Sequence, residues 1–300
     1  MNILRDKSFR LSIIISLIFL SIGFLLLHYG LIAYGWAFFI LLPIAVGIGI
    51  GALPDKKWAI YGSLVGGTIF ILLLFAGQAE GFICVLMSLP IIIPFVFLGY
   101  IISHLIKRYR LLKQTDNLKI ILFPFIIFLI IAPIEKNIVR DSKSIIEVRT
   151  EIILPFLPMQ VYNAIKSVDT LNAEKPWLMK LDLPVPEKCV LEKEEVGGLR
   201  TCYFTGGKIV EQITQLKKGE ILKMNVIDYK LTGRKWLGFK EAIYLFEPIK
   251  NNETKLTRIT TYTSELHPRF YWRPLEELGI QQEHEYVFSN LKKDLNKKYR

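Results

Sequence analysis

The chain has 300 residues, of which 52% are hydrophobic and 22% charged, and its formal net charge at pH 7 is +11. This charge divides into +6 for residues 1–134, from 10 basic and 4 acidic residues, and +5 for the remainder, from 28 basic and 23 acidic residues. The basic residues of the second part are interleaved with acidic ones and form no basic stripe, so the composition disfavours nucleic-acid binding.

Five long apolar runs fill the first 134 residues, and none recurs in the last 166. Each run has about the 17 to 25 residues needed to cross a hydrocarbon core of roughly 30 Å. Lys119, at the edge of the last run, is the only Asp, Glu, Lys or Arg within them. The expected spans are residues 11–27, 31–53, 58–76, 82–106 and 118–134. We therefore expect a helical transmembrane domain over residues 1–136, a linker at 137–143 and a water-soluble domain over 144–300.

The basic residues also predict how the spans are oriented, because Lys and Arg near a span end hold that end in the cytoplasm. They lie before the first span, between the second and third, and between the fourth and fifth: Arg5, Lys7, Arg10, Lys56, Lys57, Lys107, Arg108, Arg110 and Lys113. The alternate connections contain one charged residue, Glu80. Five spans from a cytoplasmic N-terminus would place the soluble domain outside the cytoplasm, in a bacterial periplasm or at the cell surface.

Three further features of the first 134 residues bear on the structure and function of this part of the chain. A basic start followed by an apolar stretch also describes a signal peptide, but no small-residue cleavage site follows Leu27. The span interiors lack the charged groups that mark ion or proton pathways, which disfavours a coupled transporter. The pair Gly47 and Gly51 predicts close packing between helices, because glycine lets two helix backbones approach.

The soluble part begins with a strand and two short helices. Residues 146–152 alternate apolar and charged side chains, the period of a strand with one buried face. Pro158 then opens a helical stretch, and residues 173–180 form a second short helix or loop. Six further strands are expected, separated by Gly-rich and Asn-rich turns. They cover residues 189–194, 199–205, 208–216, 221–229, 239–247 and 255–265.

The last segment has a helical period. Its apolar face carries Ile280, His284, Val287, Leu291 and Leu295, spaced three or four residues apart. The order strand, short helices, six strands and long helix predicts an α+β fold. In it, a curved antiparallel sheet of about seven strands buries its concave face by wrapping around the closing helix. Such a fold usually leaves a cavity between the sheet and the helix.

Residues of the soluble part resemble the START-like superfamily of polyketide cyclases, dehydrases and lipid-transport proteins, also called SRPBCC. The matching stretches are LPMQVYNA at 157–164, GLR at 198–200, TGG at 205–207, IVEQIT at 209–214 and LEELGIQQEHEYV at 275–287. The resemblance covers about residues 144–293. It implies a helix-grip fold that binds a lipid or another apolar molecule, while the acids and bases of enzymatic members vary among branches.

Several side chains are candidates to face the cavity. Arg200 and Glu211 stand on neighbouring expected strands, where they would form an ion pair in the cavity or an exposed cross-strand pair. His284 would hold a polar group of a ligand, transfer protons, or be a hydrogen-bonded core histidine. The aromatic candidates would line the cavity, grip the membrane interface, or simply pack in the core or at the interface. The full set is Trp177, Arg200, Tyr203, Glu211, Tyr244, Tyr262, Trp272 and His284.

Cys189 and Cys202 lie on adjacent expected strands, in a compartment that permits disulfides. Their pairing depends on strand register. A two-residue turn at Gly197 and Gly198 would place Cys202 opposite Lys193, whereas a hairpin centred between residues 195 and 196 would place the two cysteines opposite each other. No Cys/His spacing, Gly-rich phosphate loop or nucleophile elbow is present, so no metal or nucleotide cofactor is indicated.

These observations favour a non-enzymatic, multi-pass membrane protein whose extracytoplasmic domain binds a lipid or other hydrophobic small molecule. A membrane-tethered cyclase-like enzyme with His284 and Glu211 as acid and base is the first alternative. An interaction or stress-sensing module with a filled cavity is the second. Protein partners are not indicated by any motif.

Overall fold

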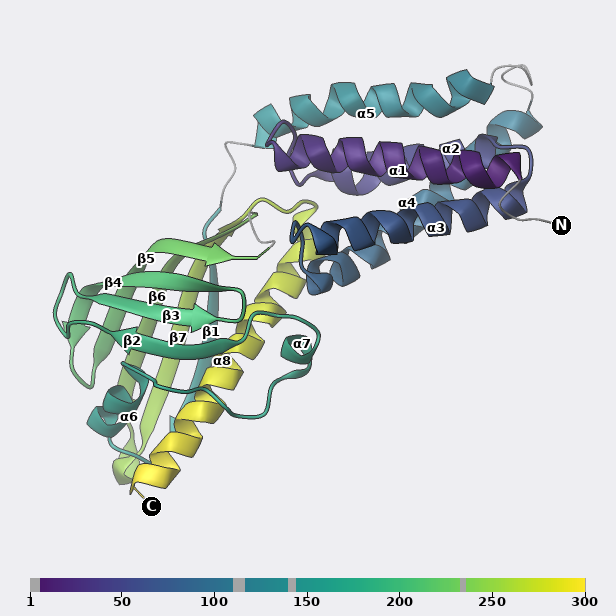
Figure 1. Cartoon of the computed structure of the whole chain (residues 1–300). Helices are drawn as coiled ribbons and strands as arrows, with labels where there is room; N and C mark the ends of the chain where they lie inside the picture. Colours follow the sequence, from purple (N-terminus) through teal and green to yellow (C-terminus); the bar gives the residue numbers. More distant parts are fainter. Residues whose placement is uncertain (1–5, 110–116, 140–143, 233–235, 300) are drawn as a thin grey trace. The chain divides into compact units, whose positions relative to one another are not determined.

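The structure is a computed structural model that describes residues 6–109, 117–139, 144–232 and 236–299. The chain divides into two compact units: the first comprises Met1–Lys143 and Glu265–Trp272, and the second Ser144–Ser264 and Arg273–Arg300 (Figure 1). Glu265–Trp272 lies inside the range expected for the soluble domain, yet it groups with the first unit. The basic flanking residues Arg5, Arg110 and Lys113 lie outside the described residues.

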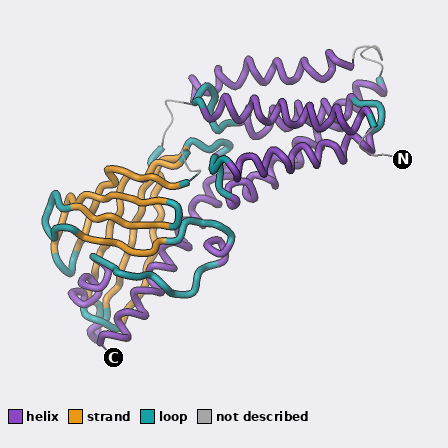
Figure 2. Tube along the Cα trace, in the orientation of Figure 1, coloured by secondary structure: helices purple, strands orange, loops and turns teal. Residues whose placement is uncertain are grey.

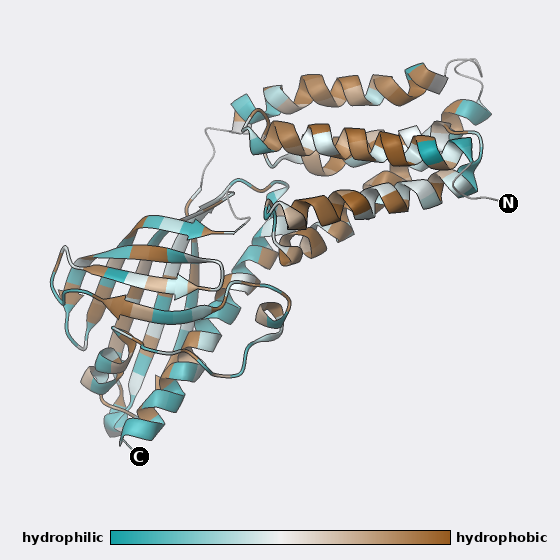
Figure 3. Cartoon of the chain, viewed as in Figure 1, coloured by the Kyte–Doolittle hydropathy of each residue, from teal (hydrophilic) through white to brown (hydrophobic). Residues whose placement is uncertain are grey.

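The first unit is helical. Its helices are α1 (Lys7–His28), η2 (Ala37–Leu41), α2 (Leu42–Ala52), α3 (Lys56–Ala76), α4 (Phe82–Arg108) and α5 (Asn117–Val139). Among the described residues, four of them, α1, α3, α4 and α5, are long and apolar enough to cross a membrane. Figure 3 shows hydrophobic residues along these helices, and many of their large apolar side chains are exposed. Such surfaces are compatible with insertion into a membrane.

The apolar run at 31–53 forms a shorter helix than expected. After α1, Gly30 adopts a φ of 65°, and helical structure resumes only at the π-helical turn η2, which continues into α2. The two elements have 5 and 11 residues, together roughly 24 Å long at the α-helical rise. The apolarity of Leu31 to Trp36 therefore did not predict where this helix begins.

A carboxylate distant in the sequence fixes the start of this helix. Glu135, near the end of α5, accepts backbone hydrogen bonds from Trp36 (2.6 Å) and Ala37 (2.8 Å). The first N–H groups of a helix lack partners and carry partial positive charge, so a carboxylate is favourable there. A Cβ atom at Gly35 would overlap this carboxylate, so a larger residue there would require the Glu135 side chain to shift.

The helix formed by η2 and α2 lies among the other helices of the first unit. All residues of α2 except Ile44 are buried. A Cβ atom on Gly47 would overlap the backbone of Val96, and one on Gly99 would overlap that of Ile44, so α2 and α4 approach to backbone contact. At the C-terminal end of α2, Lys107 of α4 donates a hydrogen bond to the Ala52 carbonyl (2.5 Å).

The second unit contains a seven-stranded sheet, two short α-helices, a short 3-10 helix and a long α-helix (Figure 2). In chain order these are β1 (Ile146–Leu154), α6 (Pro158–Ile165), α7 (Trp177–Lys180), β2 (Pro186–Leu191), β3 (Leu199–Phe204), β4 (Gly207–Lys217), β5 (Ile221–Leu231), β6 (Leu237–Pro248), η3 (Lys250–Asn252), β7 (Thr254–Ser264) and α8 (Arg269–Tyr299). The strands lie in the order β1-β7-β6-β5-β4-β3-β2 and pair antiparallel throughout. The expected fold class is confirmed.

The core of the second unit lies between the sheet and α8. Val287, Leu291 and Leu295 on one face of α8 belong to the same buried cluster as Leu222 and Tyr244 on the sheet. Successive side chains of a strand point to opposite faces, so the apolar residues of period two gather on the face that α8 covers. The strand period of two and the helical period of the sequence therefore predicted which side chains lie between the sheet and α8.

Glu135→Ala removes the acceptor of two N–H groups at the start of η2. We expect it to lower the stability of the detergent-solubilised protein by about 0.5–2 kcal/mol, the usual cost of losing a helix cap. Thermal unfolding followed by circular dichroism measures this. Glu135→Gln keeps one acceptor oxygen and serves as the control, with a smaller loss expected. Equal stability of the Ala variant and the wild type would contradict the capping role.

Candidate functional site

The face of the sheet that α8 covers is not uniformly apolar. Polar side chains from β1, β3, β4, β6 and β7 meet polar side chains from α8 in the interior of the second unit. They form two ion pairs, a histidine held by two hydroxyl groups, and a carboxylate that accepts from two more hydroxyl groups. We call this set the interior polar network: Thr150, Arg200, Glu211, Tyr244, Arg258, Thr260, Tyr262, Ser264, Glu276, Glu283 and His284.

Arg200 and Glu211 form the first ion pair. They are directly opposite each other on β3 and β4, and Arg200 Nη1 lies 2.9 Å from Glu211 Oε2. Both side chains are buried, so this is the interior pair and not the exposed cross-strand alternative. Arg200 also donates to the carbonyls of Ile165 (3.2 Å) and Lys166 (3.1 Å). Three partners compensate for the cost of burying this guanidinium.

Arg258 and Glu283 form the second ion pair, which joins the sheet to α8. Arg258 Nη2 lies 2.8 Å from Glu283 Oε2, and Nη1 donates to Oε1 at 3.2 Å. The Nε atom of Arg258 is buried and has no hydrogen-bond partner among the described residues. The Tyr244 ring lies beside both guanidinium groups, with its centroid 5.7 Å from Arg200 Cζ and 5.4 Å from Arg258 Cζ.

His284 is held by two threonine hydroxyl groups. Its Nε2 lies 2.8 Å from Thr260 Oγ1, and its Nδ1 lies 2.9 Å from Thr150 Oγ1. Burial, and then the nearby Arg258 cation, lower the pKa of His284 well below its ordinary value. The ring is therefore neutral at pH 7, and both of its nitrogens are engaged by the protein.

The fourth part of the network lies near the start of the second-unit part of α8. Glu276 accepts hydrogen bonds from the hydroxyl groups of Tyr262 (3.1 Å) and Ser264 (2.7 Å), and all three residues are buried. Tyr262 and Ser264 are on β7, so this contact also ties the sheet to α8. The buried Glu276 carboxylate thus has two hydrogen-bond donors, and it extends the network along α8 past His284.

The structure brings five of the eight expected site residues together: Arg200, Glu211, Tyr244, Tyr262 and His284. The other three lie elsewhere. Trp177 is exposed on α7, and Tyr203 is on the surface of β3, where Lys188 Nζ lies 4.9 Å from its ring centroid. Trp272 groups with the first unit, where its ring packs against Phe39 with centroids 4.8 Å apart. These three positions correct the expectation that they line the interior.

Sequence reasoning missed Arg258 and Glu283, although a signal for both was present. Tyr262 was expected to face the interior, and the strand period of two places Thr260 and Arg258 on the same face. Glu283 lies three residues after Ile280, on the expected apolar face of the closing helix. Charged residues at inward positions of two facing elements would have predicted an ion pair between them.

No protein-family model and no curated protein matches the chain. Solved structures do match about half of it. A START superfamily protein from Mycobacterium smegmatis is 9% identical and covers 50% of this chain and 97% of its own, with a TM-score of 0.38. An aromatase/cyclase from a Streptomyces species is 11% identical, covers 52% and 97%, and has a TM-score of 0.37. A protein from Thermus thermophilus is 17% identical, covers 52% and 100%, and has a TM-score of 0.36.

The second unit has the helix-grip fold of START-like domains. Its own strand order and the long α8 packed on one face of the sheet carry this statement. We call the second unit the START-like unit.

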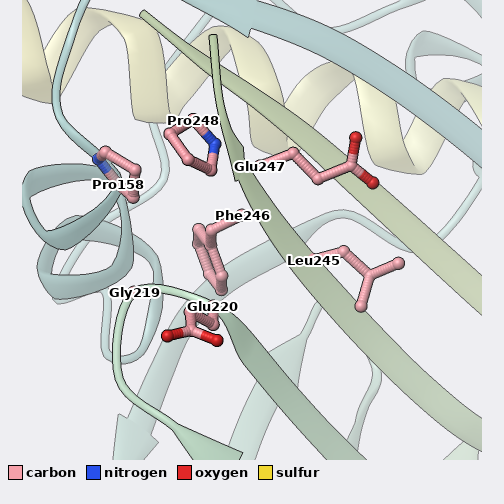
Figure 4. A pocket seen from close by; sticks show the side chains of 7 residues that line it. All are labelled: Pro158, Gly219, Glu220, Leu245, Phe246, Glu247 and Pro248. Carbon is pink, nitrogen blue, oxygen red and sulfur yellow. The ribbon is translucent and has the colours of Figure 1, made fainter. Parts of the chain in front are cut away.

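A surface hollow of about 460 Å³ lies away from this network (Figure 4). It is lined by Pro158 at the start of α6, by Gly219 and Glu220 in the β4–β5 turn, and by residues 245–248 at the end of β6. The hollow combines two carboxylates with a short apolar floor. No group of three or more His, Cys, Asp or Glu residues in the described part of the chain is placed to hold a metal ion.

Cys189 and Cys202 form a disulfide between β2 and β3, with an S–S distance of 2.05 Å. The two residues are directly opposite each other in the strand register. This register corresponds to the hairpin centred between residues 195 and 196. Gly197 adopts a φ of 91° in the connection, which lets Gly198 donate a backbone hydrogen bond to the Glu195 carbonyl (2.9 Å).

Glu194, in the same connection, ties three parts of the START-like unit together. It accepts a hydrogen bond from the Tyr162 hydroxyl on α6 (2.7 Å) and pairs with Lys166 (3.0 Å) and Lys218 (3.3 Å). Burial by itself would raise the pKa of Glu194. The hydrogen bonds from these three groups outweigh burial and lower the pKa to about 2.

This pKa predicts that acid destabilises the START-like unit. An unfolded glutamate titrates near pH 4.3, roughly, so the stability from Glu194 is complete above that pH and is lost as the pH falls towards the folded pKa. We expect the thermal stability of the wild type to fall across this pH window. Glu194→Gln should be about 1 kcal/mol less stable than the wild type at neutral pH, and its stability should fall less as the pH is lowered. Glu285→Gln, an exposed change on α8, is the control. Identical pH profiles of wild type and Glu194→Gln would rule out this role.

Proposed function

We propose that the protein is a membrane-anchored binding protein that holds a lipid or other hydrophobic small molecule inside its START-like unit, as a carrier or a sensor. The observation that carries the proposal is the buried Nε–H of Arg258, which lies between the sheet and α8 without a partner among the described residues. Buried donors in proteins are nearly always paired, so an unpaired one invites an acceptor from outside the chain.

The surroundings of Arg258 suit an apolar molecule. The strands beside it carry buried Leu222, Met224, Ala242 and Leu256. The side chains of Arg258 and Glu283 nevertheless keep 11% and 17% of their surface accessible. An interior that is mainly apolar, contains a few polar groups and is reached by solvent has the character of a small-molecule site.

The first unit would anchor this binding domain by five crossings of the membrane. Four helices meet the requirement of length and apolarity, and the helix of η2 and α2 is shorter. Its two ends, however, are bonded to Glu135 at the end of α5 and to Lys107 at the end of α4. A helix that reaches between the polar ends of two long apolar helices crosses the same thickness that they cross.

Five crossings support an extracytoplasmic START-like unit. The basic residues between α2 and α3 and at the end of α4 favour the cytoplasmic side, so the chain would leave α5 on the outer side. The disulfide between Cys189 and Cys202 supports the same side, because disulfides persist in oxidising compartments and are rare in the cytoplasm.

The interior polar network supports binding over catalysis. The enzyme alternative requires His284 and Glu211 as acid and base, but His284 has both nitrogens bonded to threonines, and Glu211 is paired with Arg200. A general acid or base needs a free site directed at its substrate. The filled-cavity interaction module remains the outcome if no ligand is found.

We expect the full-length protein, purified in detergent, to release a stoichiometric apolar molecule on denaturation, as measured by native mass spectrometry and lipid extraction. Val226→Trp should lower the bound amount about tenfold, because Val226 is opposite Glu211 and its larger replacement fills the interior. Ile227→Trp, on the exposed face of the same strand, is the matched control. A wild-type protein that carries no extractable molecule would favour the interaction module.

The proposed placement predicts the oxidation state of the three cysteines. Protein denatured without reductant should react with maleimide at Cys84 alone, and at all three thiols after reduction. A C-terminal alkaline phosphatase fusion, which is active only after export, should be active in cells. Three reactive thiols without reductant and an inactive fusion would place the START-like unit in the cytoplasm.

A further inference from the structure

One nitrogen of the Arg258 guanidinium does not bond to Glu283. Its two terminal nitrogens both face the Glu283 carboxylate, which leaves the Nε–H as the group without a partner among the described residues. Each terminal nitrogen carries a second N–H, and the Nε–H lies beside one of them on the side edge of the planar guanidinium. That edge can donate to an acceptor oxygen from outside the chain. The charge around it decides which kind of acceptor is favourable.

The charge around Arg258 is already balanced. Arg258 is paired with Glu283, and Arg200 with Glu211, so the charges of these two ion pairs sum to zero, and the remaining titratable acid of the network, Glu276, adds no cation. His284 adds no cation, because burial and the neighbouring Arg258 lower its pKa and both nitrogens are bonded to threonine hydroxyl groups. An anionic ligand group would enter this interior without a counter-charge, and a buried unpaired charge is strongly unfavourable.

The neighbouring aromatic ring reinforces this selection. Tyr244 lies opposite Arg258 on the adjacent strand, with its centroid 5.4 Å from the guanidinium carbon. The negative face of an aromatic ring stabilises the cation further and repels an incoming anion. Leu222, on the strand beyond Tyr244, continues the same row as an apolar side chain. The Arg258 guanidinium is thus neutralised by Glu283 on the side of α8, and the strands next to it continue as apolar surface.

We infer that Arg258 recognises an uncharged carbonyl oxygen, such as that of a lipid ester or amide, and selects it over a free carboxylate. This inference rests on the proposed ligand-binding function and specifies the chemical class of the ligand. The carbonyl accepts the Nε hydrogen bond, while the apolar part of the molecule lies along the buried aliphatic side chains of β5, β6 and β7.

The test uses three photoreactive probes that share one diazirine-bearing palmitoyl chain: the free acid, its methyl ester and its primary amide. Full-length protein in nanodiscs is irradiated with each probe at neutral pH, and labelled peptides are assigned by mass spectrometry. We expect the ester and the amide to label peptides of β5 to β7 at least about tenfold more than the acid.

Two variants assign the selection to one atom. Arg258→Lys keeps the charge opposite Glu283 but removes the Nε–H, and we expect it to lower ester labelling about tenfold. Arg149→Lys makes the same change in an exposed guanidinium on β1 that pairs with Glu151, outside the interior polar network, and should leave ester labelling close to wild type. Circular dichroism establishes that each variant is folded. The preference of wild type for ester over acid needs no variant and tests the inference if either fails to fold.

The outcomes separate the inference from the proposed function. Labelling of the START-like unit by the acid as strong as by the ester would overturn the selection for an uncharged carbonyl and leave hydrophobic binding intact. Ester labelling unchanged in folded Arg258→Lys would overturn the role of Arg258. An absence of labelling by all three probes within the START-like unit would overturn the proposed function itself.

Discussion

Arg258 and Glu283 carry opposite charges into the interior of the START-like unit, one from the sheet and one from α8. Neither could be buried alone, because an isolated ion loses its hydration without compensation. The pair therefore requires the helix to lie at one position along the sheet, and the bonds of His284 to Thr150 and Thr260 require the same position. Apolar packing brings sheet and helix together, and the polar groups set the register between them.

Polar groups also require specific partners in the first unit, where the groups concerned are the ends of a helix. Glu135 provides the carboxylate for the unpaired N–H groups at the start of η2, and Lys107 provides a donor for a carbonyl at the end of α2. Helix ends leave N–H and C=O groups without partners in the helix, and here side chains from neighbouring helices satisfy them. The short central helix is consequently defined by residues that lie far from it in the sequence.

The balance of charge in the interior bears directly on function. A network in which Arg200, Glu211, Glu283 and His284 are all partnered is suited to holding its own geometry, which is unlike the free acid and base that catalysis needs. Among the described residues of the network, the Nε–H of Arg258 has no partner. Binding by burial of apolar surface, oriented by a hydrogen bond from this group, is the function that we propose for this interior.

The sequence by itself determined the two-part organisation, the helix-grip order of elements and the inward faces of its strands and closing helix. Apolarity and the periods of 2 and 3.6 residues are local properties, so Tyr244, Tyr262 and His284 could be assigned to the interior directly. Only the tertiary structure decided the pairing of Arg258 with Glu283, the start of η2 and the place of Trp272. Each depends on contact between groups distant in the chain, and local pattern does not encode which distant partner a buried charge, a helix end or an aromatic ring will meet.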